Sequence, residues 1–267
     1  MTAHPAADPT AIAFVDLDNT LVYSAAAIAR WAPPGVVYRC VELRDGVERG
    51  FVTAAAALEL ERLEPLVTLV PVTARSREQY DRLDLLRGIP AAAIVSNGAL
   101  VLSGGTPDPL WESVVGSALA AAAPIGEAAA VMSAFAPRER DGRILVATFD
   151  DRAGAQSCLE AVDARLAALH WSAQRDARRV YATPAGLSKA TAAAHVIATM
   201  PHALVLAAGD SALDAGLLAL ADEAMVPAHG ELATETIGSI SFGVTRLRGP
   251  AAGEEICRWI AVRSTRE

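Results

Sequence analysis

The sequence predicts an α/β fold, in which a Rossmann-like parallel sheet forms a core and a small α+β domain is inserted into it. Strand-like and helix-like patterns alternate over residues 1–104 and again over residues 185–267. Between them, residues 105–184 open with a Gly- and Pro-containing linker and carry a different order of helices and strands. The length of 267 residues suits such an arrangement. We therefore predict a core of 1–104 and 185–267 and an insert of 105–184.

The first half of the core begins with residues 11–17 (AIAFVDL), a short apolar run rich in branched and aromatic side chains. Such a run predicts a buried strand, and this one ends in acidic residues. The Asp45-Gly46 pair predicts the turn of a hairpin. The elements predicted next along the chain are a hairpin over 36–52, a helix over 53–63, a strand over 67–73, a helix over 77–87 that Ser76 caps and Gly88 closes, and a strand over 91–98.

The insert is predicted to contain a long Ala-rich helical region, a strand, a second helix and a hairpin. Little more than Asp176-Ala177 separates its last two strands, so antiparallel pairing is the simplest arrangement. The predicted bounds are 143–149 for the first strand, 152–168 for the helix, and 170–176 and 178–184 for the hairpin. The core then resumes with a helix after Leu187, a strand over 202–210, a helix over 211–221 and a short strand over 223–228.

Composition excludes several classes of protein. With 52% hydrophobic and 20% charged residues the chain is not disordered. A net charge of −8 and a pI near 5.2 argue against a nucleic-acid surface. The Ala-rich stretches are interrupted by proline and charged residues and do not resemble membrane spans. Three widely spaced cysteines and no visible signal peptide lead us to expect a soluble, cytoplasmic protein.

Two pairs of carboxylates follow predicted strands. Asp16 and Asp18 lie at the end of the first strand, and their spacing of two places both on one side of an extended chain. Such carboxylates repel each other unless a cation or a proton shares the site, and Mg²⁺ is a suitable cation. Asp210 and Asp214 follow a later strand at a spacing that places both on one face of a helix turn. A helix cap is an equally good explanation of Asp210.

The basic residues show one exception. Of 23 basic side chains 22 are arginine, and Lys189 is the only lysine. An ammonium group is a compact point charge, where a guanidinium is a flat fork. Lys189 is predicted just inside a helix whose N-terminus disfavours cations, so a nearby group of acids or a phosphate explains it better. Thr73 ends the second strand and offers a hydroxyl to a phosphate oxygen.

In chain order DLDNT, Thr73, Lys189 after a long insertion, and GDSALD resemble the four motifs of the haloacid dehalogenase (HAD) superfamily. The resemblance covers nearly the whole chain. Within the superfamily, the chain resembles the phosphatases that carry a type II cap between the second and third motifs, namely the Cof-like and sucrose-phosphatase-like members. It implies a HAD core with the insert as the cap, and a Mg²⁺-dependent phosphatase acting on a small phosphorylated metabolite, a sugar phosphate.

The resemblance also implies roles for individual residues. Asp16 is the nucleophile that forms an aspartyl-phosphate, and Asp18 is first the general acid and then the base. An acid at position 18 favours phosphate ester hydrolysis, because dehalogenases of the superfamily lack it. The residues implied to hold the phosphoryl group are Thr73 and Lys189, with Asn97 near the substrate. Those implied to hold Mg²⁺ are Asp16, Asp18 through its backbone carbonyl, Asp210 and Asp214, the last supporting either the ion or Lys189.

Some positions leave alternatives open. The second motif reads VTARS, with alanine where such relatives usually have glycine, which leaves the roles of Arg75 and Ser76 open. Turn chemistry in Asn-Gly explains Asn97 as well as a substrate contact does. The 36–52 hairpin is either a flap over the site or a plain surface hairpin. Cap residues available for specificity, for which the sequence supports no site, are Arg143, Trp171, Arg178 and Arg179.

Two other classes of function remain as alternatives. A response-regulator receiver also places aspartates, a threonine and a lysine on a parallel sheet, but the length and the DxD spacing argue against it. The second alternative is a HAD-like protein that has lost catalysis and binds a partner.

Overall fold

The computed structural model describes residues 11–31, 35–234 and 242–265. An eight-stranded sheet forms the core, in the order β14-β13-β12-β1-β4-β5-β6-β7. It is parallel from β14 to β5, and β6 and β7 add an antiparallel edge. Its strands are β1 (Ala11–Asp16), β4 (Thr68–Val72), β5 (Ala92–Val95), β6 (Leu100–Ser103), β7 (Thr106–Pro107), β12 (Leu204–Ala208), β13 (Glu223–Val226) and β14 (Gly243–Val244).

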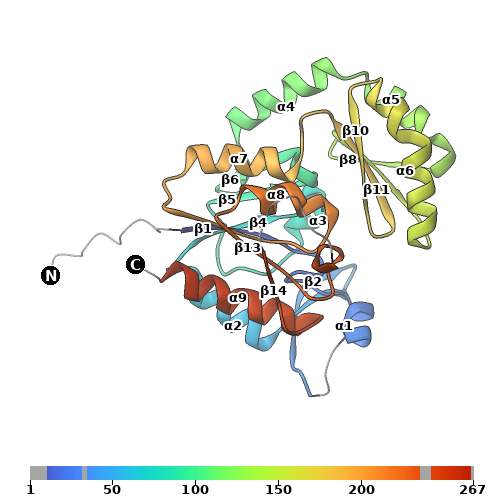
Figure 1. Ribbon diagram of the computed structural model, residues 1–267. Helices are drawn as coiled ribbons and strands as arrows, with labels where there is room; N and C mark the ends of the chain where they lie inside the picture. The colour runs from blue at the N-terminus through green and yellow to red at the C-terminus, as the bar shows by residue number, and fades with distance from the viewer. Residues whose placement is uncertain (1–10, 32–34, 235–241, 266–267) are drawn as a thin grey trace.

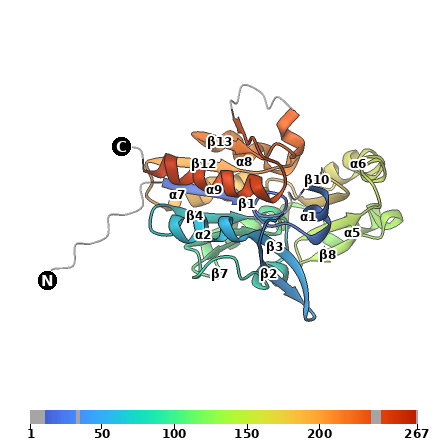
Figure 2. The same cartoon turned by 90° about the horizontal axis from the view of Figure 1, so that it is seen from below.

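Helices cover both faces of this sheet (Figures 1 and 2). Helices α2 (Ala54–Leu63) and α9 (Pro250–Ser264) lie side by side on one face. On the other face lie α7 (Lys189–Thr199) and α8 (Ala215–Leu220). A parallel sheet buried on both faces explains why its strands read as continuous apolar runs. The predicted α/β class and the parallel core sheet are confirmed.

The central strand β1 shows how the sheet positions the chemistry. All six of its residues are buried. Ile12 and Phe14 pack in the same cluster as α7 and α8, and Ala13 and Val15 pack in the cluster of α2 and α9. Successive side chains of a strand point to opposite faces, so Asp16 continues the Ile12 and Phe14 series. Asp16 therefore emerges at the end of the strand on the side of α7.

A second, antiparallel sheet lies within the insert, in the order β10-β11-β9-β8. Leu145, Ala147 and Val180 on one of its faces pack with α6 into a separate core cluster. This sheet and its helices confirm an α+β cap beside the core (Figure 1). The elements are α4 (Pro109–Ala121), α5 (Ile125–Val131), β8 (Arg138–Arg140), β9 (Ile144–Thr148), α6 (Arg152–Ala167), β10 (Trp171–Asp176) and β11 (Arg179–Pro184).

The remaining elements are small. A hairpin of β2 (Tyr38–Arg44) and β3 (Val47–Thr53) turns at Asp45 and Gly46, both with positive φ. Helix α1 (Ala25–Trp31) precedes it. Short 3₁₀ segments are η1 (Ser96–Gly98), η2 (Ser133–Phe135), η3 (Ala212–Asp214) and η4 (Glu231–Thr234).

Helix α3 (Arg77–Asp81) is shorter than the helix predicted over 77–87. Ser76 caps its start as predicted, through a capping box. The chain leaves the helix because Leu83 forms a bridge with Glu42, the Asp84 N–H donates to the Val41 carbonyl at 2.8 Å, and Leu85 is buried. Tertiary pairing with β2 therefore overrides the local helix pattern.

Among the described residues no single helix is long and apolar enough to cross a membrane. Helices α4 and α5 together have the length and apolar composition of a membrane span, but they are two helices bent by 59° relative to each other.

Candidate active site

Three aspartates from two adjacent strand ends form the centre of the site. β1 pairs in parallel with β12, so Asp16 at the end of β1 lies beside the turn after β12 that carries Asp210. Asp214 follows in η3. Carboxylate oxygens of the three residues lie within 4.8 Å of one another. The carboxyl end of the parallel sheet therefore presents a dense group of negative charge, where ligands bind in open α/β sheets.

Lys189 enters this group from the first turn of α7. Its Nζ lies 2.6 Å from Asp16 Oδ1 and 2.6 Å from Asp214 Oδ1, and the side chain is only 2% exposed. Ser188 caps the helix and fixes where the lysine side chain begins. Burial lowers the pKa of Lys189, but the charges of Asp16 and Asp214 outweigh this and raise the pKa above its ordinary value. Lys189 therefore stays charged.

The Asp16 carboxylate is held by both oxygens. Lys189 binds Oδ1, and the Thr20 hydroxyl donates to Oδ2 at 3.1 Å. Burial is the largest effect on its pKa and the Asp214 charge adds to it, while Lys189 acts in the opposite direction; the result is a pKa of about 8. Asp16 has a fixed orientation but is not stably charged without a further cation.

Asp210 and Asp214 differ in their partners. Asp214 binds Lys189 with one oxygen, and its other oxygen accepts hydrogen bonds from the Ser211 N–H and hydroxyl at 3.1 and 3.2 Å. The Asp210 carboxylate has no hydrogen-bond or ion-pair partner in the described parts of the chain. Burial and the neighbouring charges of Asp16 and Asp214 raise its pKa well above the ordinary value. A cation beside Asp16 and Asp210 would relieve this repulsion, so these two residues fit a Mg²⁺ ion.

Asp18 points to a different partner. Arg75 Nε and Nη2 donate to its two oxygens at 2.8 Å each, and Arg75 Nη1 donates to Glu42 of β2 at 2.7 Å. Burial raises the pKa of Asp18, but the hydrogen bonds and charge of Arg75 outweigh this and hold it below its ordinary value. Arg75 and Glu42 were not predicted as site residues. The signal for Arg75 is an arginine two residues after Thr73 in a strand-end loop.

Thr73 and Asn97 lie next to each other, just after the adjacent strands β4 and β5. The Thr73 hydroxyl accepts from the Arg75 N–H at 3.1 Å, and the Asn97 N–H donates to the Thr73 carbonyl at 3.1 Å. Asn97 adopts a left-handed conformation with φ 55°. Its amide group is buried without a hydrogen-bond partner among the described residues, and it does not line the large cavity. The structure thus gives Asn97 the turn geometry that was the alternative prediction.

Two close approaches keep Lys189 in place. A Cβ on Gly98, which has φ +92°, would lie 2.1 Å from the Ser188 carbonyl oxygen. A Cβ on Gly209 would lie 2.5 Å from the Asp214 side chain. Since such contacts are not tolerated, only glycine lets these loops approach the start of α7 and the Asp214 carboxylate so closely.

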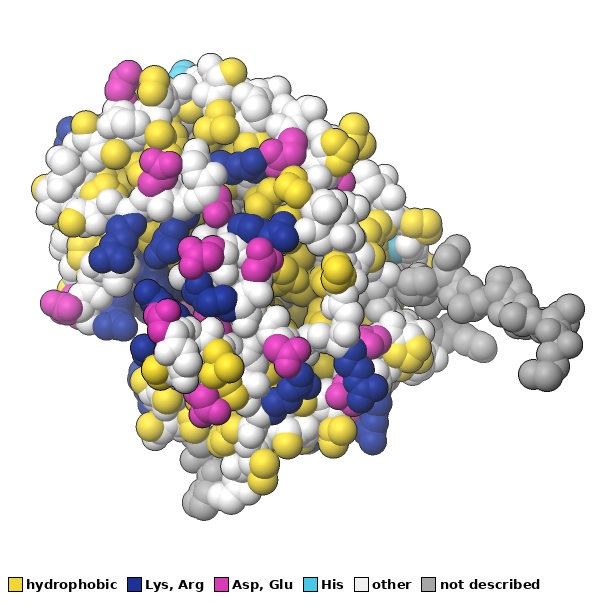
Figure 3. Space-filling model, turned by 180° about the vertical axis from the view of Figure 1, so that it is seen from behind, with side chains coloured by type: hydrophobic (Ala, Val, Ile, Leu, Met, Phe, Trp, Pro, Cys, Tyr) yellow, Lys and Arg dark blue, Asp and Glu magenta, His cyan; other side chains and the backbone are white. Residues whose placement is uncertain are grey.

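A cavity of about 840 Å³ lies between the core and the cap. Its lining includes Asp16, Asp18, Lys189 and Asp210 from the core, and Asp176, Arg179 and Tyr181 from the cap. Lys and Arg side chains gather around a hollow on the back of the molecule (Figure 3). Of the four cap residues that the sequence offered for specificity, Arg178 and Arg179 line the cavity. Arg143 instead binds Glu112, and Trp171 is buried in the cap core.

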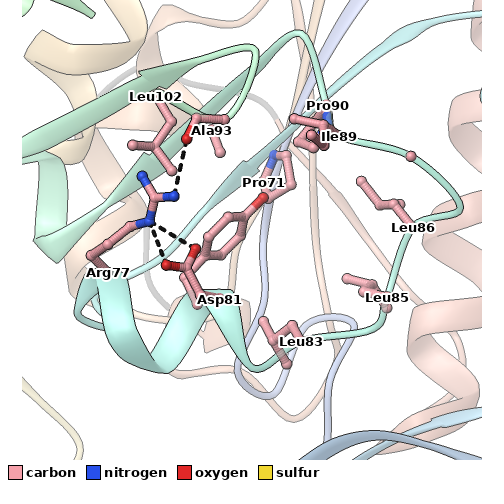
Figure 4. Close-up of a pocket in the computed structure, with 13 residues that line it drawn as sticks. Pro71, Arg77, Asp81, Leu83, Leu85, Leu86, Ile89, Pro90, Ala93 and Leu102 are labelled. Carbon is pink, nitrogen blue, oxygen red and sulfur yellow. Dashed lines mark hydrogen bonds and ion pairs between the residues drawn. The ribbon is translucent and has the colours of Figure 1, made fainter. Parts of the chain in front are cut away.

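A second cavity of about 360 Å³ lies beside α3 (Figure 4). Its lining is largely apolar, and the Arg77 guanidinium binds the Asp81 carboxylate of the same helix at 2.6 Å. None of the three clustered aspartates lines it. The larger cavity is therefore the candidate active site.

The fold and site together define a two-part α/β protein, with buried carboxylates and a lysine at the carboxyl end of a parallel sheet, facing an antiparallel cap. No protein-family model matches the chain, and a search of curated proteins finds no match. Solved structures do match over almost the whole length.

The chain is similar to the sucrose-phosphatase of a Synechocystis species, solved with sucrose and phosphate, with 14% identity and a TM-score of 0.66 over 95% of this chain and 98% of that one. It is also similar to a HAD subclass IIB sugar phosphatase, with 14% identity and a TM-score of 0.60 over 95% of this chain and 99% of that one. A third similar structure is that of a trehalose-6-phosphate phosphatase related protein, with 18% identity and a TM-score of 0.54 over 94% of this chain and 97% of that one. The chain therefore has the fold of the capped HAD superfamily phosphatases.

Proposed function

We propose that the protein is a Mg²⁺-dependent phosphoric monoester hydrolase that acts on a small phosphorylated metabolite, a sugar phosphate. In this proposal 1–104 and 185–267 are the catalytic core and 105–184 is the cap, except that β7 (Thr106–Pro107) at the start of this segment adds an edge strand to the core sheet. The observation that carries it is the buried group of Asp16, Lys189 and Asp214 at 2.6 Å contacts, beside Asp210, whose carboxylate has no partner among the described residues. The similarity of fold to sugar phosphatases supports the substrate class. The free, widely spaced cysteines support a cytoplasmic location.

In the proposed mechanism Asp16 attacks phosphorus and forms an aspartyl-phosphate, while Lys189 and the Thr73 hydroxyl hold the phosphoryl oxygens. Asp18 must be protonated to give a proton to the leaving oxygen, so the first step requires release of its contact with Arg75, which favours the charged form. Asp18 later takes a proton from the attacking water. Asp16, Asp210 and the Asp18 carbonyl would hold Mg²⁺, which offsets the negative charge of the phosphoryl group when bound.

The test is release of inorganic phosphate by the purified chain from a panel of phosphorylated sugars, sugar acids, nucleotides and cofactors, with and without Mg²⁺. We expect Mg²⁺-dependent release from at least one sugar phosphate. A long-lived phosphoprotein without turnover would favour the receiver alternative instead. No release from any member would favour a catalytically silent binding protein.

Mg²⁺ is expected to stabilise the chain more at pH 8 than at pH 5.5. Because Asp16 titrates near pH 8 in the folded chain and near 3.8 when unfolded, the folded state binds more protons between these values. Stability without metal therefore falls as pH rises through that window. Mg²⁺ binds the charged carboxylates, and at about 100 times its Kd it adds about 2.7 kcal/mol, or roughly 5–10 °C in Tm.

Differential scanning calorimetry at both pH values, with and without Mg²⁺, measures this. Asp210→Asn is the matched variant, because it removes one ligand and one repelling charge. It is expected to lose the Mg²⁺ increment and to be more stable than the parent chain at pH 8 without metal. An equal Mg²⁺ increment in parent and variant would contradict the assigned site.

Replacing Arg75 with glutamine is expected to raise the pKa of Asp18 and to lower kcat by about tenfold. The two hydrogen bonds at 2.8 Å both orient Asp18 and favour its charged form. An adjacent guanidinium lowers a carboxyl pKa by about 1–3. The limb of the kcat/KM profile in which Asp18 loses its proton should therefore move to higher pH in the variant.

The matched control is Arg82→Gln, since Arg82 contacts Glu42 at 3.5 Å without binding Asp18. Its profile should keep the parent limb. If the Arg75 variant folds normally and shows the parent pH profile, Arg75 does not control the pKa of Asp18.

A further inference from the structure

The large cavity is strongly basic, although the chain as a whole is acidic. Nine basic side chains line it against five acidic ones, in a chain with a net charge of −8. The basic members are Arg30, Arg44, Arg49, Arg75, Arg82, Arg140, Arg178, Arg179 and Lys189, and the acidic members are Asp16, Asp18, Glu42, Asp176 and Asp210. The positive charge is thus concentrated where a substrate would enter.

Three of the basic groups are already engaged. Lys189 binds Asp16 and Asp214, Arg75 binds Asp18 and Glu42, and Arg82 binds Glu42 and Glu78. Among the described residues, the one ion pair of Arg44 is an exposed contact with Asp45 at 3.7 Å. Within the ranges that the structure describes, no ion pair reaches Arg30, Arg49, Arg140, Arg178 or Arg179. Most of the arginine charge in the cavity is therefore available to a ligand.

The cap arginines face the cavity by strand register. Arg179 of β11 pairs with Thr148 of β9, and Arg140 of β8 pairs with Ile144 of the same β9 strand. Thr148 and Ile144 are an even number of residues apart, so both arginines lie on one face of the cap sheet. The opposite face, with Ala147, packs on α6. The sheet therefore presents Arg140 and Arg179 together toward the core.

The transferred phosphoryl group does not account for these cap arginines. In the proposed mechanism its oxygens contact two residues of the core, Thr73 directly after β4 and Lys189 in the first turn of α7. Arg140 and Arg179 lie on the other wall, where the leaving group of the substrate would bind. A guanidinium fork matches the two oxygens of a carboxylate or a phosphate. A cavity of about 840 Å³ also has room for a leaving group beyond the phosphoryl group.

We propose that the substrate carries a second anionic group, a carboxylate or a second phosphate, on its leaving group, and that Arg140 and Arg179 of the cap bind it with support from Arg178. This inference rests on the proposed function and narrows its substrate class to phosphorylated sugar acids or sugar bisphosphates. A neutral sugar phosphate would give none of these guanidinium groups an anion to bind, although Arg178 already donates to the Asp150 carbonyl at 3.2 Å.

The experiment compares matched substrates in Mg²⁺ at low ionic strength. Glucose 6-phosphate is paired with 6-phosphogluconate, which adds a carboxylate, and fructose 6-phosphate with fructose 1,6-bisphosphate, which adds a phosphate. We expect kcat/KM to be at least about tenfold higher for the anionic member of one pair, because charge-assisted hydrogen bonds are the stronger ones. The pair that responds identifies the second group. Added salt should reduce the preference.

Arg140→Gln and Arg179→Gln are each expected to reduce this preference by about tenfold. Arg165→Gln is the control, because it removes the same charge from the exposed outer surface of α6 in the same cap. It should keep the parent preference. If the Arg140 and Arg179 variants kept the parent preference for the anionic substrate, the proposed subsite would be wrong.

Failure of the subsite and failure of the proposed function give different results. Equal kcat/KM within both pairs overturns the second-anion subsite while hydrolysis itself stands. If no compound releases phosphate, the same pairs are titrated calorimetrically into the Asp16→Asn chain. Tighter binding of an anionic member, lost in Arg179→Gln, would then support the subsite alone, and equal binding would overturn it.

Discussion

Lys189→Arg is expected to lower kcat/KM at least about tenfold, equivalent to about 1.4 kcal/mol of transition-state stabilisation, although it preserves the charge. The ammonium of Lys189 lies 2.6 Å from oxygens of both Asp16 and Asp214 in a site where its side chain is 2% exposed. A guanidinium is larger and planar, and cannot place one nitrogen between these two oxygens without moving them. The displaced Asp16 carboxylate would then no longer be aligned for attack.

Lys189→Met should affect stability as well as activity. Removing the cation leaves two buried carboxylates facing each other, and breaking a buried ion pair in this way costs about 3–5 kcal/mol. Urea unfolding at pH 8 without Mg²⁺ measures the loss, and phosphate release measures activity. Arg165→Lys, an exchange of the same two residue types on the exposed surface of α6, should leave both unchanged. A fully active Lys189→Arg chain with the parent stability would make the lone lysine a coincidence of composition.

The arrangement around Lys189 could largely be expected from the sequence, because it depends on strand ends. Apolar runs locate β1 and β12, and their parallel pairing places Asp16 and Asp210 at one edge. The single lysine among 22 arginines singles out a position where side-chain shape is important. What the sequence could not resolve is which carboxylate takes which partner. Hydrogen bonds from Ser211 hold Asp214 in place to bind Lys189, while the Asp210 carboxylate has no partner in the part of the chain that the structure describes.

Contacts between distant segments could not be predicted in the same way. Arg75 links Asp18 to Glu42, and neither the hairpin position nor the arginine side-chain direction follows from local pattern. The early end of α3 has the same cause, because pairing of Leu83 with Glu42 overrides helix propensity. The basic cavity also depends on how the cap packs on the core. Its arginines come from five separate parts of the chain and show no common motif.

Asp16→Asn is expected to reduce phosphate release by about 10⁴-fold or more, the scale seen when a nucleophile is removed from a catalytic group that acts as a unit. The amide cannot form the acyl-phosphate linkage, so the first step of the proposed mechanism is lost. The fold should survive, because Lys189 keeps its contact with Asp214 at 2.6 Å and the substitution removes one of the repelling charges. Lost activity would therefore report on chemistry rather than unfolding.

The measurement is phosphate release by the parent and the variant, with circular dichroism and Tm as the check on folding. Asp163→Asn is the control, because Asp163 is exposed on α6 and makes no ion pair among the described residues. Mass spectrometry of substrate-quenched samples adds a second readout, since only the parent chain should gain a phosphoryl group. If Asp16→Asn retained activity or still acquired that mass, another side chain would be the nucleophile. The pairing of Asp16 with Lys189 would then serve only to neutralise buried charge.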